Sequence, residues 1–157
     1  MLETSRQAFL GLMAARESGR PTAIPAADLF PDVAAHLQAE LADNAREGVT
    51  LEFRNLCVRK VELILVRNFA DNAQDEFVVR VRAHAQKVMR QKGAVIQQDE
   101  DVTAFDQYLA LGRLDGRWKL KEILAPAAGA ASVGEENLDQ DSSPQQVQWY
   151  YQHTRAN

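Results

Sequence analysis

The stretch Phe77-Val78-Val79-Arg80-Val81-Arg82-Ala83-His84-Ala85 decides the fold class. The residues at positions 77, 79, 81, 83 and 85 are all apolar, whereas the intervening positions 80, 82 and 84 carry Arg, Arg and His. Successive side chains of a β-strand point to opposite faces of its sheet. The alternation therefore predicts a half-buried strand with one apolar face and one largely basic face.

Three other segments of the chain also have strand character, namely residues 51–69, 102–114 and 117–124. Turn signals separate the strands at 71–75, at 91–93 and at Asp115-Gly116. The Asp115-Gly116 pair is the strongest hairpin signal in the sequence, because glycine tolerates the positive φ that a tight turn needs. Consecutive strands joined by such turns predict an antiparallel sheet.

Two amphipathic helices are predicted before the strands, over residues 4–18 and 27–47. The first has an apolar stripe of Phe9, Leu12 and Met13. The second repeats an apolar residue every four positions, at Leu29, Val33, Leu37 and Leu41, with Phe30 widening the stripe and Gly48 at the expected stop. Together, these elements predict an α+β fold in which N-terminal helices pack on a curved antiparallel sheet.

The sequence predicts an α+β domain over residues 1–124, a flexible Ala/Gly-rich and then acidic linker over 125–142, and a short helical tail over 143–157. Ser143-Pro144 is a good helix start. The tail concentrates three large aromatic residues, Trp149, Tyr150 and Tyr151. Two interpretations of them stay open: they fold back onto the domain, or they dock onto another protein or a second copy, which would make a homodimer.

Length, composition and charge argue against several classes of protein. A length of 157 residues suits one domain. No apolar run approaches the ~20 residues of a membrane-spanning helix, and the start of the chain does not resemble a secretory signal. Cys57 is the single cysteine, so no internal disulfide can form. The net charge is −4, and the +4 surplus confined to residues 54–121 is too small to indicate a nucleic-acid partner.

No recognisable catalytic or cofactor-binding motif is present, and neither a catalytic residue nor a cofactor is expected. His84 lacks a partner at metal-ligand spacing, and Asp99-Glu100-Asp101 lacks the spaced ligands and glycine of a calcium loop. Asp106 and Tyr108 lie two residues apart and would suit proton abstraction in an apolar cone. The alternation with Phe105, Leu109 and Leu111 places both outward, so catalysis is the weaker hypothesis for this pair.

Basic residues are expected to share a surface of the sheet. Arg80 and Arg82 lie on one face of their strand, and Lys119 and Lys121 on one face of theirs. An ordinary solvated surface is one interpretation of these four residues. In the other, they contact anionic lipid headgroups or an acidic partner, and each contributes ~1 kcal/mol at a membrane surface.

The order of these segments resembles the Tim-forty-four-like domain, a family named for the matrix-side scaffold of protein import at the mitochondrial inner membrane, with bacterial relatives. The resemblance covers about residues 5–124. It rests on 56–66, 77–86 and 93–99, on Gln107-Tyr108-Leu109-Ala110-Leu111-Gly112-Arg113, and on Gly116-Arg117-Trp118-Lys119-Leu120-Lys121-Glu122-Ile123. Tyr108 stands where many members carry Trp. The resemblance implies an open cone like nuclear transport factor two or cystatin, an apolar pocket between helices and sheet, and peripheral membrane attachment without enzymatic activity.

The sequence is therefore interpreted as a non-enzymatic scaffold or binding module at a membrane surface or membrane complex, holding a lipid or other apolar ligand or serving protein translocation. We expect it at the cytoplasmic face of the inner membrane, peripherally or as a soluble part of an anchored protein. The residues expected to line the pocket or contact lipid are Phe9, Leu12, Met13, Phe30, Val33 and Leu37. The alternatives are a small isomerase or dehydratase on the same cone, and an interaction module that docks through the aromatic tail.

Overall fold

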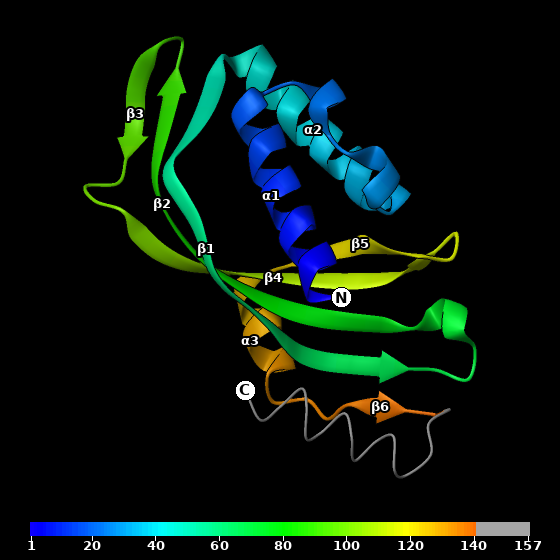
Figure 1. Ribbon diagram of the computed structural model, residues 1–157. Helices are drawn as coiled ribbons and strands as arrows, with labels where there is room; N and C mark the ends of the chain where they lie inside the picture. Colours follow the sequence, from blue (N-terminus) through cyan, green and yellow to red (C-terminus); the bar gives the residue numbers. More distant parts are fainter. Residues whose placement is uncertain (141–157) are drawn as a thin grey trace.

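The computed structural model describes residues 1–140 and confirms the α+β class (Figure 1). A six-stranded sheet curls into a half-barrel, with order β5-β4-β2-β1-β6, while β3 pairs with the far part of β2. All strand pairs are antiparallel except β1 with β6. The strands are β1 Val49–Asn68, β2 Glu76–Gln91, β3 Ala94–Gln98, β4 Thr103–Leu114, β5 Arg117–Leu124 and β6 Leu138–Asp139.

The curl of the sheet comes from irregularities in its longest strand, β1. Its register with β2 shifts between Arg54 and Cys57, between Val58 and Lys60, and between Leu63 and Leu65. Asn55 has a φ of 56°, in the left-handed region. Each bulge adds local twist and bends the strand. The first half of β1, with the second half of β2 and with β3, therefore forms an arm that rises beside the helices (Figure 1).

Helices α1, Leu2–Ser18, and α2, Pro31–Glu47, cover the inner face of the sheet. Each ends at a glycine in the left-handed conformation, Gly19 at φ 66° and Gly48 at φ 70°, so the predicted stop at Gly48 is confirmed. Short 3₁₀ turns, Pro21–Ala23 and Ala26–Asp28, join the helices. The backbone N–H of Phe30 donates to the carbonyl of Leu120 at 2.8 Å, which fastens this connection to β5.

The main core lies between the helices and the inner face. It contains Phe9, Leu12, Leu37 and Leu41 from the helices and Phe77, Val79, Val81, Leu109, Leu111 and Leu120 from the strands. Burying a side chain of this size contributes roughly 1.5–3 kcal/mol. Apolar side chains therefore fill much of the concavity that the sequence interpretation assigned to a pocket.

The outer face of the sheet carries a second, smaller cluster of Leu65, Val78 and Ala110. Helix α3, Pro126–Ser132, lies on this side of the sheet against β4 (Figure 1). Residues 125–142 were expected to be a flexible linker, whereas their described part forms α3 and β6. The aromatic tail, including Trp149, Tyr150 and Tyr151, lies outside the described residues. Within residues 1–140 no helix is long and apolar enough to cross a membrane.

Candidate functional site

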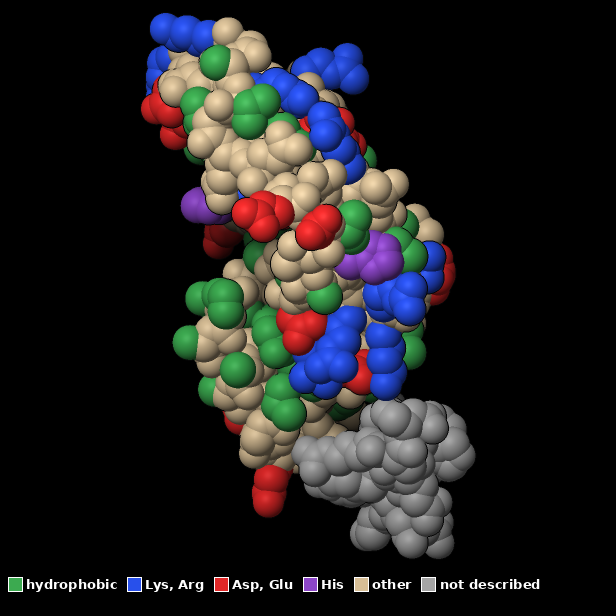
Figure 2. All heavy atoms as spheres, turned by 90° about the vertical axis from the view of Figure 1, so that its left-hand side faces the viewer, with side chains coloured by type: hydrophobic (Ala, Val, Ile, Leu, Met, Phe, Trp, Pro, Cys, Tyr) green, Lys and Arg blue, Asp and Glu red, His purple; other side chains and the backbone are tan. Residues whose placement is uncertain are grey.

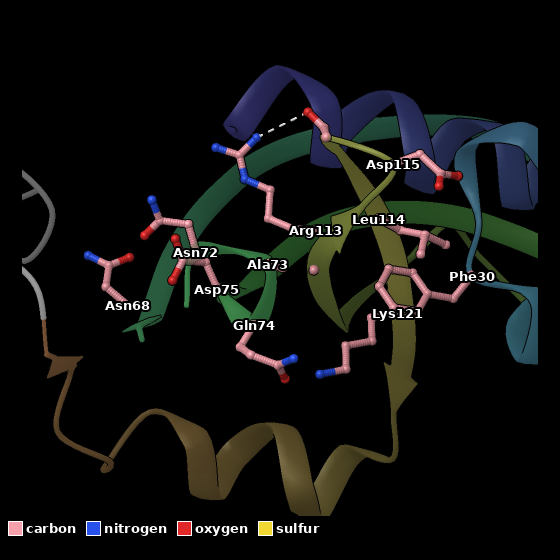
Figure 3. Close-up of a pocket in the computed structure, with 12 residues that line it drawn as sticks. Phe30, Asn68, Asn72, Ala73, Gln74, Asp75, Arg113, Leu114, Asp115 and Lys121 are labelled. Atoms are coloured by element: carbon pink, nitrogen blue, oxygen red, sulfur yellow. Dashed lines mark hydrogen bonds between the residues drawn. The ribbon is translucent and has the colours of Figure 1, made fainter. Parts of the chain in front are cut away.

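A groove lies at the end of the sheet where two hairpins meet, and we call it the hairpin groove (Figure 3). Its volume is about 810 Å³. One wall is the 3₁₀ turn Asn72–Gln74 between β1 and β2, and the other is the β4–β5 turn. Its lining includes Phe30, Asn68, Asn72, Gln74, Asp75, Arg113, Leu114, Asp115 and Lys121.

The charged side chains of the hairpin groove are already engaged within the fold. Asp75 accepts a hydrogen bond from the N–H of Phe69 at 2.8 Å, and Lys121 Nζ lies 2.7 Å from Glu76. The Arg113 guanidinium stacks 4.2 Å from the ring centroid of Trp118. Asn68, Asn72 and Gln74 also line the groove, and each carboxamide can both donate and accept hydrogen bonds. The groove is a polar surface with one aromatic side chain, Phe30, at its edge.

Another groove lies between helix α1 and the arm, and we call it the arm groove. Its volume is about 450 Å³, within the ~300–1,000 Å³ of small-molecule sites. Its apolar lining consists of Met13, Leu51, Phe53, Ala85 and Phe105, and its polar lining of Arg16, Glu40, Lys87, Asp99, Thr103 and Gln107.

Charges flank the apolar lining of the arm groove on both sides. Arg16 Nε lies 3.1 Å from Glu40 Oε1, which ties α1 to α2. Across the groove, Asp99 Oδ2 accepts a hydrogen bond at 3.0 Å from the backbone N–H of Lys87. The Lys87 ammonium forms no ion pair among residues 1–140. The groove thus combines an apolar floor with a cation that no carboxylate of residues 1–140 neutralises.

The six residues expected to line a pocket have three different environments. Phe9, Leu12 and Leu37 are buried in the core. Met13 is buried too, and its side chain also borders the arm groove. Phe30 borders the hairpin groove instead, and Val33 packs at the margin of the core beside a shallow hollow between α2 and β5. Of these six residues, Met13 alone lines the arm groove.

The four basic residues expected on one surface each form an ion pair. Arg80 donates to Glu62 from Nε at 2.8 Å, and Arg82 lies 3.3 Å from Asp106. Lys119 lies 3.2 Å from Asp115, and Lys121 reaches Glu76. The hydrogen bond to the Glu62 carboxylate raises the pKa of Arg80. One face of the molecule shows the same interleaving of Lys and Arg with Asp and Glu (Figure 2).

Arg59 differs from these four residues because it forms no ion pair within the described part of the chain. It borders a shallow outer hollow together with Arg82 and Asp106. Lys60 lies next to it in sequence and is bound to Glu62 at 2.6 Å. Among the described residues, Arg59 therefore gives the outer face more unneutralised positive charge than the four basic residues predicted from sequence.

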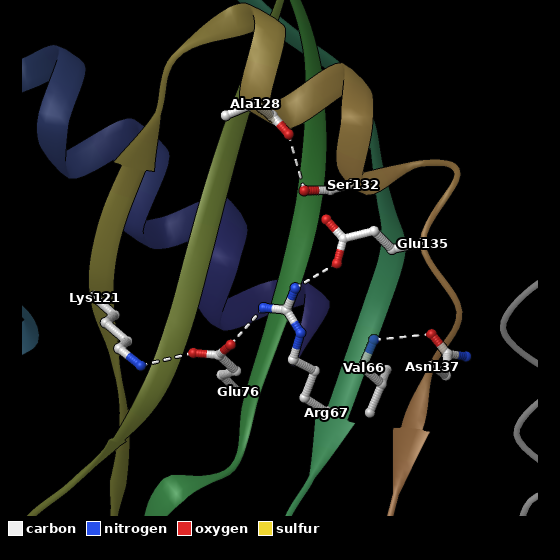
Figure 4. Close-up of polar contacts among 8 residues, drawn as sticks. All are labelled: Val66, Arg67, Glu76, Lys121, Ala128, Ser132, Glu135 and Asn137. Carbon is white, nitrogen blue, oxygen red and sulfur yellow. Dashed lines mark hydrogen bonds and ion pairs between the residues drawn. The ribbon is translucent and has the colours of Figure 1, made fainter.

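A polar network that sequence reasoning missed joins the C-terminal segment to the outer face (Figure 4). Arg67 bridges Glu76 and Glu135, with 2.5 Å to each carboxylate. Asn137 Oδ1 accepts a hydrogen bond from the N–H of Val66 at 3.0 Å. These contacts hold the chain between α3 and β6 against β1. The number of charged residues in each segment does not predict these contacts, because the partners are up to 71 positions apart in the sequence.

The residues considered as catalytic groups or metal ligands either lie outside both grooves or form hydrogen bonds within the fold. Asp106 and Tyr108 occupy the outer face, as predicted, opposite Arg82 and Arg80 in the β2–β4 register. Asp99 lines the arm groove, and its carboxylate accepts a hydrogen bond from the backbone N–H of Lys87. Among residues 1–140 no group of three or more His, Cys, Asp or Glu is arranged to hold a metal ion.

Neither a family model nor a curated protein matches the sequence. Among solved structures, the chain is similar to the intermembrane space region of the chloroplast protein ARC6, with 15% identity, a TM-score of 0.52, and coverage of 80% of this chain and 97% of that one. A de novo designed β-sheet protein gives 14% identity and a TM-score of 0.38, with coverage of 78% and 84%. At these identities the similarity to the ARC6 region concerns the fold alone.

Proposed function

We propose that this protein is a non-enzymatic binding module that works at a membrane surface or in a membrane complex, and that the arm groove holds the apolar part of an amphiphilic ligand. One observation carries the proposal: Met13, Phe53 and Phe105 line a groove whose rim bears Lys87, a cation without an ion-pair partner among residues 1–140. An acyl chain would lie on the apolar floor, and an anionic head would meet the ammonium.

The membrane setting draws on two similarities. The sequence resembles the Tim-forty-four-like domain over about residues 5–124, and that family implies peripheral attachment to membranes. The fold is similar to the intermembrane space region of ARC6, a region whose description places it between membranes. Exposed Arg59 on the outer face adds a contact for an anionic surface, worth ~1 kcal/mol within a Debye length.

The position of Asp106 and Tyr108 favours binding over the isomerase alternative. A proton-abstracting pair has to reach a substrate held in an apolar site. Asp106 pairs instead with Arg82 on the outer face, and Tyr108 packs beneath α3. The arm groove takes its ionisable side chains from four other residues, Arg16, Glu40, Lys87 and Asp99.

Binding of dodecanoate, followed by calorimetry or by displacement of a fluorescent fatty acid, tests the proposal. Thr103 is exposed at the rim, so Thr103→Trp would place an indole in the groove without disturbing the core. We expect this variant to bind at least about tenfold more weakly, a change of ~1.4 kcal/mol. Thr50→Trp is the matched control, because Thr50 is an exposed strand residue outside the groove.

Two further experiments test the charged rim of the arm groove and the contact with a membrane. Lys87→Gln should weaken binding of dodecanoate but leave binding of dodecanol unchanged, because only the carboxylate meets the ammonium. Co-sedimentation with phosphatidylglycerol vesicles should exceed that with phosphatidylcholine vesicles at low salt. Absence of binding to dodecanoate, or equal binding by the two tryptophan variants, would refute the groove as the site.

A further inference from the structure

The arm ends in a strand edge that has no partner among residues 1–140. Strand β3 pairs with β2 through Val88↔Gln98 and Gln91↔Ala94, and no described strand pairs with its other edge. In Figure 1, β3 stands at the outer margin of the arm, away from α3 and β6. Its unpaired backbone groups form a template on which another strand can add.

The side chains of β3 do not protect this edge. Proteins usually protect an open edge with a charged residue, a proline or a bulge. Ala94-Val95-Ile96-Gln97-Gln98 contains no charge and no proline, and all five residues are exposed. Its one irregularity is a bulge at Ile96, where the register with β2 shifts between Met89 and Arg90. Val95 and Ile96 keep 51% and 53% of their surface accessible, the largest values among the exposed large hydrophobic residues of the described chain. Such a strand is suited to pairing.

Charges flank β3 with opposite signs at its two ends. Lys92 precedes the strand in a tight turn, where it and Gly93 have φ values of 50° and 84°. Glu100 and Asp101 follow the strand, and both are exposed without an ion pair inside residues 1–140. The Lys92 ammonium also lacks an ion-pair partner in that range. The edge is therefore basic at its start, neutral and aliphatic in the middle, and acidic at its end.

We propose that β3 is a self-pairing edge, and that two copies of this chain associate by antiparallel addition of β3 to β3. A two-fold axis at Ile96 places Val95 opposite Gln97 and Ala94 opposite Gln98 of the second copy. The same axis brings Lys92 of each copy beside Glu100 of the other, so the charges attract at both ends. A parallel arrangement would bring like charges together, which is destabilising.

A two-fold axis makes the contact closed and self-complementary, so it produces a dimer and not a fibre. The two arms would then form one continuous sheet, with Ile96 of each copy packed across the axis. A strand pair of this length buries less than the ~1,200 Å² of a standard interface, so the dissociation constant is expected on the order of 0.1 mM. This dimer differs from one held by the aromatic tail, since β3 and residues 143–157 are separate segments.

Sedimentation equilibrium of the full chain, from about 10 µM to about 1 mM, tests the proposal. The wild type should approach dimeric mass at the upper end. Ile96→Lys places two ammonium groups across the axis and should weaken association at least about tenfold. Val133→Lys is its matched control, because Val133 is 48% exposed after α3 and away from the arm; it should associate like the wild type.

The charge arrangement provides a second test that does not rely on the aliphatic residues. Lys92→Glu should weaken the dimer by placing carboxylates together, and Lys92→Glu combined with Glu100→Lys should restore it. Circular dichroism would show that each variant is folded. A wild type that stays monomeric at 1 mM, a dimer unaffected by Ile96→Lys, or a dimer lost on substituting Trp149 and Tyr150 instead, would overturn the proposal.

Discussion

Gly129 of helix α3 lies directly against the ring of Tyr108 on strand β4. A β-carbon at position 129 would stand 2.1 Å from Cγ of the tyrosine and 2.6 Å from its Cβ, which is closer than any real contact. Both residues are buried. The absence of a side chain at 129 is therefore what allows α3 to sit on the outer face of the sheet.

Gly129→Ala should therefore detach or displace α3, although alanine is the better helix former by ~1 kcal/mol. We expect a net loss of roughly 1–3 kcal/mol in the free energy of unfolding, measured by urea denaturation. Gly134→Ala is the control, because the nearest atom to a β-carbon there is the Ala131 carbonyl oxygen at 3.6 Å. Equal stability of the two variants would show that α3 does not depend on this contact.

The close approach of Gly129 to Tyr108 also explains why the structure has helix α3 where the sequence predicted a flexible linker over residues 125–142. A run rich in Ala and Gly favours mobility when composition alone is considered. Gly129 instead provides a close approach between helix and sheet, and that role depends on Tyr108, 21 positions earlier in the sequence. The four longest strands and both long helices were predictable because their patterns are local: period two in 77–85 and apolar residues every four positions in α2.

The candidate sites were less predictable for a related reason. The alternation correctly placed Arg80 and Arg82 outward, but their partners depend on the register with β1 and β4. The register shift between Leu63 and Leu65 sets Glu62 opposite Arg80, and the residue pattern does not predict this shift. The arm groove likewise depends on the bend at Asn55, whose φ is 56°. Asparagine adopts this region more readily than most residues, but the strand pattern around it does not predict a bend.

Glu76 should give the protein a pH-dependent component of stability. Burial by itself would raise the pKa of this carboxyl, but hydrogen bonds from Lys121 and Arg67 outweigh burial, and the net pKa lies below 4.5. A carboxyl with a lowered folded pKa stabilises the fold above its unfolded pKa, and this contribution is lost as the pH falls through the folded value. The wild type should therefore lose stability progressively below about pH 4.5.

Glu76→Gln removes the titrating group and leaves Arg67 and Lys121 partly unpaired. We expect it to unfold with ~1 kcal/mol less free energy at pH 7, and the difference from the wild type should shrink as the pH falls below 4. Urea denaturation across this pH range would measure it. A difference that stays constant with pH would mean that the carboxylate charge has no role.

Glu52 on the arm should titrate with an unusually low pKa. Hydrogen bonds from Arg54 and then from Arg90 outweigh the effect of burial and lower its pKa to about 2. Arg54→Gln should raise this pKa toward 4.5, since it removes the first of these donors. The chemical shift of the Glu52 carboxyl carbon, followed by NMR between pH 1.5 and 6, would report both values. Titration of the wild-type group near 4.5 would contradict the ion-pair geometry.

A substitution of Phe9 tests whether the apolar stripe of helix α1 belongs to the core or contacts a ligand. Its side chain is 1% exposed, and its ring centroid lies 6.2 Å from that of Phe105, which lines the arm groove from the other side. Phe9→Ala should lower the free energy of unfolding by roughly 3–5 kcal/mol, because the lost packing adds to the cavity left behind. Phe30→Ala should cost less, because Phe30 is only partly buried beside the hairpin groove. If Phe9→Ala instead kept wild-type stability and weakened only ligand or vesicle binding, helix α1 would contact lipid as the sequence interpretation proposed, and its apolar stripe would not be part of the core.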